Sequence, residues 1–492
     1  MKILMIAPEC APFSKVGGLA DMVASLSKEM AASGDDVRIF TPLYRCVKRD
    51  DSFELALSSL SVHLGFGVEE FCAVWKKKLG GAEVYFSEFN KFYDRPGIYN
   101  EGGYSYQDNG ARFAFLSKAA IEFCQATGWI PDVVHCHDWT VGFVPVYLNT
   151  IYRSAPIGKA ASVFTIHNMQ HQGIFPLELL DYAGLPSREV FKPDNLEALG
   201  NVNMMKGGIY NSTKITTVSP TYAREIQSDP MGCGLDDVLR FKAADMVGVV
   251  NGIDYDEWNP RTDKLIPANY DENDFSGKAK CKAALQKKLG LDVNSKIPIF
   301  GVVSRLYDQK GLDMLANIVD PLMANMQIQI ALLGSGEKWL EDAFLRFSHV
   351  YKGRVGTYIG YDNSLAHLIE AGSDFFLMPS RFEPCGLNQL YSMAYGTPPI
   401  ARATGGLVDT ITSYSEGGKK AKGDGFLFGD ATTSALYNTI GWACSTYYDR
   451  PKDYVTLRQN GMKKDFSWKN SSAEYKQLYK WAVDQRAFIN LK

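Results

Sequence analysis

The sequence predicts an α/β protein of two domains, each built on a doubly wound parallel sheet. Three observations support this prediction. A strand-helix-strand pattern opens the chain over residues 2–41, a stretch without apolar periodicity interrupts the pattern at 251–278, and strand-like runs alternate with helical runs again from residue 298 onward. A chain of 492 residues also exceeds the size at which one hydrophobic core stops growing.

The first predicted unit is a strand, a helix and a second strand. Residues 2–7 form a short apolar run typical of a buried strand. The helix is predicted from apolar residues that recur on one helical face, namely Leu19, Met22, Val23, Leu26 and Met30. Gly34 is expected to end this helix, and residues 37–41 are the next strand. This βαβ unit is typical of a Rossmann-like sheet.

Three further strands are predicted in the first half, at residues 133–135, 162–165 and 215–218. Each runs directly into polar residues. Ligands of open α/β sheets bind outside the carboxyl ends of the strands, so we expect the functional residues of this half at those ends.

The pattern restarts in the second half. The runs PIFGVVSRL, IQIALLG, RVGTYIGY, DFFLMPS and PPIARATGG alternate with helical stretches and predict a second parallel sheet. A terminal helix is predicted because Tyr475, Leu478, Tyr479 and Ala482 have helical spacing.

We therefore expect four segments. They are an N-terminal Rossmann-like domain at 1–250, a hinge or linker at 251–278, a C-terminal Rossmann-like domain at 279–465, and a terminal helix within 466–492 that packs back toward the N-terminal domain.

Composition argues against some partner classes. A net charge of −3 and a pI near 6.2 give no general attraction to nucleic acid or to anionic lipid. No apolar stretch approaches the roughly 20 residues that span a bilayer. The nine cysteines are scattered without a C-x-x-C pair, which fits a reducing compartment. We expect no nucleic-acid partner and no membrane association.

The segment SKVGGLAD lies between the first strand and the first helix. Gly17 and Gly18 would let a phosphate or a sugar approach the backbone, Lys15 adds a positive charge, and Asp21 suits the first helical turn. The alternative is a tight strand-to-helix turn with a solvated lysine, and both interpretations stay open here.

In SRLYDQKG, Arg305 and Lys310 follow a buried strand and precede a helix that begins near Gly311. An arginine fork and a lysine point charge suit a nucleoside diphosphate and the charge that develops on it as a leaving group. The alternative is a pair of solvated surface charges.

In PSRFEPCGLNQL, Glu383 lies just before Cys385, Gly386 and Leu387, which start another helix. This carboxylate can bind sugar hydroxyls, with the N–H groups of the helix start turned to phosphate, or it can be an ordinary residue of a helix start. In ATGGLVDT a glycine pair again lies between a strand and a helix. It can belong to a ligand site at the strand end, or it can be a packing turn.

Two histidine motifs follow strands of the first half. In HCHDWT, His135, His137 and Asp138 superficially resemble a metal cluster, but no convergent further ligands are recognisable, so we expect no metal. One core imidazole and one site imidazole is the alternative. In TIHNMQHQG, His167 and Asn168 lie at a strand end, where a purely structural histidine is the alternative.

Together these motifs resemble the bacterial glycogen synthase and plant starch synthase family of retaining glucosyltransferases. The likeness rests on SKVGGLAD, HCHDW, TIHNMQHQG, VVNGID, SRLYDQKG, IGYDNSLAH, PSRFEPCGLNQL and ATGGLVDT, in order along nearly the whole chain. It implies the GT-B fold, in which two Rossmann-like domains face each other across a deep cleft, with 1–250 as the acceptor domain and 279–465 as the donor domain. It also implies transfer of glucose from a nucleotide sugar, usually ADP-glucose, to the non-reducing end of an α-1,4-glucan, without a cofactor or a metal.

The resemblance also implies roles for matching residues. Arg305 and Lys310 would hold the donor diphosphate, Glu383 would bind glucose hydroxyls, His167 would lie beside the anomeric carbon, and Asp138 would contact donor or acceptor hydroxyls. The further donor contacts implied are Lys15, Gly17, Gly18, Asn251, Tyr361 against the adenine, Cys385, Gly386, Leu387 and Asn388. Glu9, Asp21 and Asn168 would belong to the acceptor side, and Tyr99, in an aromatic-rich segment, is a further acceptor candidate.

Asn388 and Val16 depart from residues that are frequent in the family, which leaves the preferred donor base open. A UDP-glucose-preferring synthase, a phosphorylase-like enzyme and a non-catalytic glucan-binding protein are the alternatives. The resemblance places the protein in a bacterial cytoplasm, or in a plastid or on a starch granule of a photosynthetic eukaryote.

Overall fold

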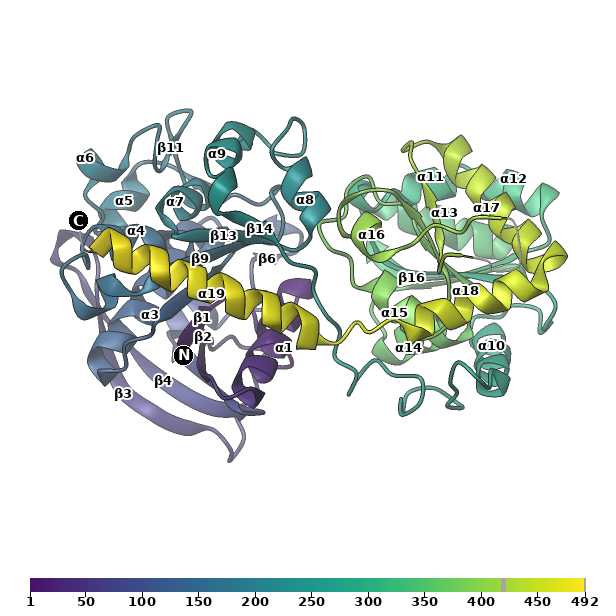
Figure 1. Ribbon diagram of the computed structural model, residues 1–492, viewed down its shortest axis with the longest axis horizontal. Helices are drawn as coiled ribbons and strands as arrows, with labels where there is room; N and C mark the ends of the chain where they lie inside the picture. Colours follow the sequence, from purple (N-terminus) through teal and green to yellow (C-terminus); the bar gives the residue numbers. More distant parts are fainter. Residues whose placement is uncertain (417–421, 491–492) are drawn as a thin grey trace. The chain divides into compact units, whose positions relative to one another are not determined.

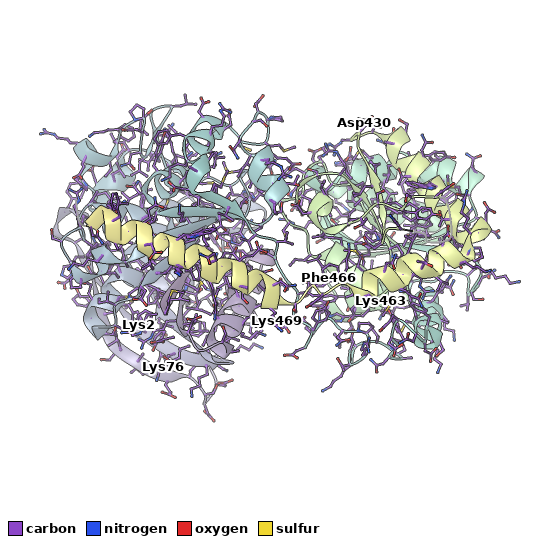
Figure 2. The ribbon with its side chains drawn as sticks, viewed as in Figure 1. Lys2, Lys76, Asp430, Lys463, Phe466 and Lys469 are labelled. Carbon is purple, nitrogen blue, oxygen red and sulfur yellow. The ribbon has the colours of Figure 1, made fainter. Side chains whose placement is uncertain are left out.

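The protein forms two compact units in a computed structural model that describes residues 1–416 and 422–490 (Figure 1). Unit 1 comprises Met1–Asn251 together with the chain from Trp468 onward, and unit 2 comprises Gly252–Ser467. The chain therefore passes between the units twice, at residues 251–252 and at 467–468. Phe466 and Lys469 flank the second passage (Figure 2).

Unit 1 contains a nine-stranded sheet in the order β14-β13-β9-β8-β1-β2-β5-β4-β3. Its strands are β1 (Lys2–Ile6), β2 (Asp36–Pro42), β3 (Glu54–His63), β4 (Glu69–Leu79), β5 (Ala82–Glu88), β8 (Val133–His137), β9 (Ala161–Ile166), β13 (Lys214–Thr217) and β14 (Met246–Gly248). All neighbouring pairs are parallel except β5 with β4 and β4 with β3. Counted along the chain, the parallel strands have the Rossmann order 3-2-1-4-5-6 with one further strand at the end.

The strands predicted in the first half are confirmed as β1, β2, β8, β9 and β13. The long antiparallel extension formed by β3, β4 and β5 escaped prediction. In β3 only two residues are buried, so the chain there lacks the continuous apolar run that marks the central strands. By contrast, every residue of β8 and β9 is buried.

The helices of unit 1 cover its sheet. They are α1 (Gly18–Ala32), α2 (Asn90–Tyr93), α3 (Asn109–Thr127), α4 (Phe143–Asn149), α5 (Glu178–Ala183), α6 (Ser187–Val190), α7 (Met204–Asn211), α8 (Pro220–Glu225), α9 (Asp236–Phe241) and α19 (Trp468–Asn490). The predicted first and last helices are confirmed as α1 and α19. Helix α19 packs on β9 and beside α1 (Figure 1). Gly34 follows the end of α1 with a φ of +94°, a left-handed conformation that glycine adopts without strain.

Small two- and three-residue strands complete unit 1: β6 (Asn100–Glu101), β7 (Tyr104–Ser105), β10 (Ile174–Phe175), β11 (Glu197–Ala198) and β12 (Asn201–Asn203). Strands β6 and β7 pair within the aromatic-rich segment that carries Tyr99.

Unit 2 contains a six-stranded parallel sheet in the order β17-β16-β15-β18-β19-β20. Its strands are β15 (Ile299–Leu306), β16 (Gln329–Gly336), β17 (Val355–Ile359), β18 (Phe375–Met378), β19 (Pro399–Arg402) and β20 (Phe426–Phe428). This is again the Rossmann order 3-2-1-4-5-6, with the topological switch point between β15 and β18. The five strands predicted here are confirmed, and the short β20 escaped prediction.

Alternate residues of the unit 2 strands enter two separate hydrophobic cores. Phe375 and Leu377 belong to one cluster, whereas Phe376 and Met378 belong to the other. Both faces of the sheet are therefore covered, as a parallel sheet requires. The helices are α10 (Ser276–Lys288), α11 (Leu312–Ala316), α12 (Val319–Asn325), α13 (Lys338–Val350), α14 (Asn363–Gly372), α15 (Asn388–Ala394), α16 (Gly405–Thr410), α17 (Thr433–Asp449) and α18 (Pro451–Lys463).

Residues 252–278, expected as a linker, pack into unit 2. Trp258 is buried with its ring stacked between His367, at 3.8 Å between centroids, and Tyr391, at 3.9 Å. The backbone N–H of Ile253 donates to the Phe466 carbonyl at 2.8 Å, so the two chain passages start side by side in unit 2. Isolated large apolar residues anchor this segment without any periodicity that a sequence pattern would reveal. Among the described residues, no helix has the length and apolar content needed to cross a bilayer.

Candidate active site

In unit 1 the predicted residues cluster where β1 and β8 end, at the switch point of the sheet. Glu9, in the loop after β1, is almost fully buried and holds that loop closed. Its carboxylate accepts hydrogen bonds from the backbone N–H groups of Val16 and Gly17 and from the Tyr99 hydroxyl. Burial raises the pKa of Glu9, and these bonds partly oppose that effect. The structure thus brings Glu9, Tyr99 and the glycine turn together.

The glycine turn presents an open surface beside a charged pair. No heavy atom other than those of its chain neighbours lies within 4 Å of a Cβ placed on Gly17, so no packing contact requires glycine there. Gly18 begins α1, and Asp21 lies in its first turn as predicted. The Lys15 Nζ and an Asp21 carboxylate oxygen are 2.7 Å apart, with 41% of the Lys15 side chain exposed.

The two histidine motifs meet at the ends of β8 and β9. His137 Nδ1 and His167 Nε2 are 3.2 Å apart. Burial lowers the pKa of His167 to about 3, so this imidazole is neutral near pH 7. His135 lies deeper, 2.8 Å from the Tyr479 hydroxyl of α19 and 2.6 Å from the Thr165 hydroxyl. His135 is therefore a core histidine, and His137 contacts the site histidine.

Asp138 has a strained backbone. Its φ of 63° and ψ of 179° lie in a region that is essentially restricted to glycine. Its carboxylate accepts hydrogen bonds from the backbone N–H of His167, at 2.7 Å, and from the backbone N–H of Asn168. Burial raises the pKa of Asp138 to about 7 in spite of these bonds. The Asn168 side chain accepts the Gln170 N–H at 3.0 Å, which shapes the same loop.

The described part of the chain contains no group of three or more His, Cys, Asp and Glu side chains arranged to hold a metal ion.

In unit 2 the predicted residues cluster at the switch point between β15 and β18. Lys310 follows β15, Glu383 follows β18, and their Nζ and Oε2 atoms are 2.6 Å apart. Only 6% of the Glu383 side chain is exposed, and the Ser380 hydroxyl donates to the same oxygen at 2.9 Å. Arg305, near the end of β15, is exposed. The cation and carboxylate that the sequence placed in different motifs are thus direct partners.

The helix start after Glu383 is held by close contacts. Gly386 has a φ of +72°, which favours glycine. Leu387 precedes the first residue of α15, Asn388, whose Nδ2 donates to the Val303 carbonyl at 2.6 Å. Cys385 is buried. A Cβ on Gly405 would lie 1.9 Å from the Glu383 carbonyl oxygen, so glycine is required there for the close approach of the two loops.

Two other predicted donor residues are Tyr361, in unit 2, and Asn251, in unit 1. Tyr361 follows β17 and is 81% exposed. Asn251 is the last residue of unit 1 before the chain enters unit 2. It is buried, and among the described residues its Oδ1 atom has no hydrogen-bond partner.

Sequence reasoning missed the residues that connect the loops of unit 2. Arg381, beside Glu383, binds Asp313 of α11, and the Arg402 guanidinium binds the Arg381 carbonyl. The available signal was Arg381 within the motif PSRFEPCGLNQL and Asp313 two residues after the end of SRLYDQKG. Nothing in the spacing of the motifs indicated that the two side chains pair with each other.

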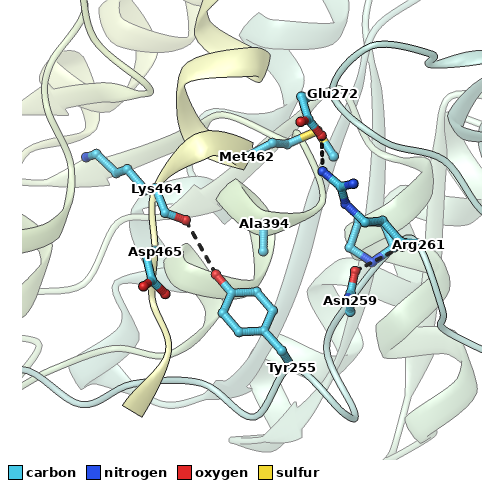
Figure 3. Close-up of a pocket in the computed structure, with 9 residues that line it drawn as sticks. Tyr255, Asn259, Arg261, Glu272, Ala394, Met462, Lys464 and Asp465 are labelled. Carbon is cyan, nitrogen blue, oxygen red and sulfur yellow. Dashed lines mark hydrogen bonds and ion pairs between the residues drawn. The ribbon is translucent and has the colours of Figure 1, made fainter. Parts of the chain in front are cut away.

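Unit 2 also contains a pocket of about 220 Å³ with lining residues that differ from the predicted site (Figure 3). It lies by Ala394, the last residue of α15, and so at the opposite end of that helix from Asn388. The Tyr255 hydroxyl donates to the Lys464 carbonyl at 3.5 Å, and Arg261 pairs with Glu272.

Comparison with known proteins decides the family. Residues 2–241 match the family described as starch synthase catalytic domain, and residues 285–461 match the family described as glycosyl transferases group 1. Glycogen synthase 1 of Geobacter sulfurreducens is 46% identical over 495 residues, which cover 100% of this chain and 98% of that protein. The chain belongs to the glycogen and starch synthase family of glycosyltransferases. Glycogen synthase of Myxococcus xanthus is 44% identical to this chain, over 97% of this chain and 99% of that protein.

Solved structures agree with this assignment to the glycogen and starch synthase family. The catalytic domain of starch synthase IV from Arabidopsis thaliana, bound to ADP and acarbose, matches with a TM-score of 0.91 and 34% identity, covering 98% of this chain and 99% of that chain. Sucrose-phosphate synthase from Thermosynechococcus elongatus matches with a TM-score of 0.60 and 18% identity over 97% of this chain and 98% of that chain, which shows the fold alone. The predicted GT-B class of fold, with two Rossmann-like units, is confirmed, and the protein is a glycosyltransferase of glycogen or starch synthesis.

Proposed function

We propose that the enzyme transfers glucose from ADP-glucose to the non-reducing end of an α-1,4-glucan, with retention of the anomeric configuration and release of ADP. The observation that carries this proposal is the Lys310–Glu383 pair at the switch point of unit 2, because Rossmann-like sheets bind nucleotides there. The starch synthase IV catalytic domain, whose structure contains ADP, supports the choice of donor.

Lys310 and Arg305 would contact the donor diphosphate, and the backbone near Leu387 and Asn388 would complete the phosphate site. A lysine that is already paired with a carboxylate keeps two further N–H donors, so Lys310 can bind phosphate while it still holds Glu383. Glu383 would use its remaining acceptor positions for glucose hydroxyls. Its burial keeps the carboxylate fixed in one orientation.

We propose five further donor contacts: Lys15, Gly17, Gly18, Asn251 and Tyr361. Lys15 is exposed beside the open backbone of Gly17, which supports a role in binding phosphate. The exposed ring of Tyr361 is available to stack on an adenine. Closure of the two domains across a cleft would exclude water from the donor and limit its hydrolysis.

On the acceptor side we propose Glu9, Asp21, Asn168 and Tyr99. Glu9 already accepts three hydrogen bonds, two from the glycine turn and one from Tyr99. We therefore infer that Glu9 acts mainly by fixing the turn and the tyrosine, and that the tyrosine ring offers the apolar face on which a sugar ring packs.

The chemistry breaks the bond between the anomeric carbon and the diphosphate oxygen, and its electron pair leaves with ADP. Arg305 and Lys310 would offset the negative charge that grows on the leaving group. The acceptor hydroxyl attacks the oxocarbenium-like sugar on the same face and passes its proton to the departing phosphate. His167, neutral because of burial, would donate or accept a hydrogen bond beside the anomeric carbon without adding charge. Asp138 would contact sugar hydroxyls.

The proposed partners are an α-1,4-glucan and a nucleotide sugar, without nucleic acid or membrane. We also propose a cytoplasmic location, supported by the bacterial relatives and by the free thiols of all nine cysteines.

Initial rates with ADP-glucose and UDP-glucose test this function, on glycogen, amylopectin and short maltooligosaccharides, with and without a chelator. We expect ADP-glucose to be the better donor, the chelator to leave the rate unchanged, and the newly formed anomeric proton to show the α configuration by NMR. Faster transfer from UDP-glucose would replace the proposed donor. Glucan binding without turnover of either donor would favour the non-catalytic alternative.

A further inference from the structure

Three neighbouring strands of unit 2, β15, β18 and β19, end in loops that are tied together by one arginine. Arg381 belongs to the loop after β18, between Ser380 and Glu383. Its side chain reaches the loop and helix that follow β15, and its carbonyl oxygen accepts a hydrogen bond from Arg402 at the end of β19. The strands lie side by side in the sheet, so their loops emerge at the same edge.

The side-chain contact is a two-pronged ion pair. Arg381 Nη1 and Nη2 each lie 2.6 Å from a different carboxylate oxygen of Asp313. Arg381 Nη1 also donates to the Asp308 carbonyl at 2.8 Å. The side chains are 32% and 21% exposed, so water screens the pair only in part. The pKa of Asp313 is lowered, chiefly by its hydrogen bond to Arg381.

The backbones of the two loops are in contact as well. The Arg381 N–H donates to the Gln309 carbonyl at 2.8 Å. A Cβ on Gly311 would lie 2.0 Å from the Pro379 carbonyl oxygen, so only glycine allows this approach, and its φ of +65° also favours glycine. Lys310 lies between Gln309 and Gly311 in one loop, and Glu383 lies two residues after Arg381 in the other.

We propose that Arg381 is a positioning residue for the donor site: by clamping Asp313 it fixes Lys310 of one loop against Glu383 of the other. The proposal rests on the proposed function, in which these two side chains bind the nucleotide sugar. Arg381 itself need not touch the substrate. Lysine cannot replace it, because an ammonium is a point charge and lacks the planar fork that grips both oxygens of one carboxylate.

The test measures ADP affinity by titration calorimetry on the full-length chain. Four proteins are compared: the wild type, Arg381→Lys, Lys310→Gln and the double variant. Arg261→Lys is the matched control, because Arg261 also pairs with a carboxylate, Glu272, in the same unit but beside the pocket at the far end of α15 (Figure 3). Thermal unfolding verifies that each variant is folded, and Asp313→Asn, which keeps the shape of the side chain, replaces Arg381→Lys if that variant does not fold.

We expect Arg381→Lys to weaken ADP binding about tenfold in the wild-type background, as loss of a two-pronged charged pair would do. In the Lys310→Gln background, Arg381→Lys should weaken ADP binding less than about twofold, because Lys310, the residue through which Arg381 acts, is already absent. Arg261→Lys should bind ADP like the wild type. In steady-state assays the KM for the donor should rise in Arg381→Lys, while the KM for the glucan should not change.

Two results would overturn the inference alone. One is weak binding in Lys310→Gln with normal binding in Arg381→Lys, and the other is an equal loss from Arg381→Lys in both backgrounds. Normal ADP binding in Lys310→Gln would instead overturn the proposed donor site, and the positioning role with it.

Discussion

Asp138 combines an unfavourable backbone conformation with an unfavourable charge. Its φ and ψ angles fall where side chains other than that of glycine are strained by about 1–3 kcal/mol, and burial raises the pKa of its carboxyl to about 7. The carboxylate of this strained residue accepts hydrogen bonds from the backbone N–H groups of His167 and Asn168. We infer that the strain is retained because it aims the carboxyl at the sugar site.

The raised pKa predicts how stability depends on pH. Because the folded state holds the proton of Asp138 up to about pH 7, whereas the unfolded chain releases it near its ordinary value, stability should fall as pH rises through this interval. Asp138→Asn, which resembles the protonated form, should therefore stabilise the protein at pH 8, with an upper bound of about 4 kcal/mol, and much less near pH 4. The same variant should lose activity.

Urea unfolding of the wild type and Asp138→Asn from pH 4 to pH 8 provides the measurement. Asp51→Asn, which removes an exposed carboxylate of the same unit, is the control, and the stability gap between Asp138→Asn and this control should widen from pH 4 to pH 8. A stability gap for Asp138→Asn that stays constant across the range would contradict the prediction.

At the scale of residues, the sequence located candidate site residues near strand ends better than it identified their partners. Asp138 and His167 directly follow β8 and β9. Lys310 and Glu383 lie four and five residues after the ends of β15 and β18. Each was found in the sequence because a polar or charged residue soon after a buried run is a strong local signal. That Lys310 pairs with Glu383 is a contact between residues 73 positions apart, and no local pattern indicates it. The clamp formed by Arg381 escaped prediction for the same reason.

At the scale of elements, helix α19 is joined to the unit 1 sheet by a buried polar network. The Tyr479 hydroxyl lies 2.8 Å from His135, whose other ring nitrogen contacts Thr165 of the next strand. Thr165 in turn contacts the Thr216 hydroxyl at 3.1 Å. These groups are buried, so each bond lost leaves a polar atom without water to replace its partner.

Tyr479→Phe should therefore destabilise unit 1. The substitution leaves a ring nitrogen of His135 unpaired in the core, which costs about 1–3 kcal/mol. The free energy of unfolding from denaturant titration measures the effect. Tyr104→Phe serves as the control, since that tyrosine is 84% exposed, and it should change stability by less than about 0.5 kcal/mol. An equal effect of the two substitutions would show that the network contributes nothing.

Elements with a clear apolar pattern were predictable from the sequence, and elements without such a pattern were not. The central strands β8 and β9 are buried throughout and consist mostly of apolar residues. The antiparallel strand β3 is mostly exposed, and the short β20 has three residues, so neither produces a recognisable pattern. Trp258 and its stacking partners show the same limit, because a single aromatic residue in an irregular segment does not reveal which core it enters.

At the scale of the whole molecule, the same topology occurs twice. Each unit has its switch point next to its first strand, and in each unit a group of predicted site residues lies near it: the glycine turn and the histidines in unit 1, and the Lys310–Glu383 pair in unit 2. The repeated strand order explains why a chain with two different sets of motifs has both sets at equivalent places of two sheets. It also fits the proposed function, in which the enzyme holds two substrates, a nucleotide sugar and a glucan.

The rate of glucosyl transfer from ADP-glucose to glycogen in Arg305→Ala and Lys310→Ala tests the central claim most directly. Lys338→Ala, at an exposed lysine of α13, is the control, and the far-ultraviolet circular dichroism spectrum verifies the fold. We predict that each of the two site variants loses about 10²–10³-fold in rate while it remains folded, because stabilisation of the leaving diphosphate is lost. Transfer at the wild-type rate in both variants would contradict the account.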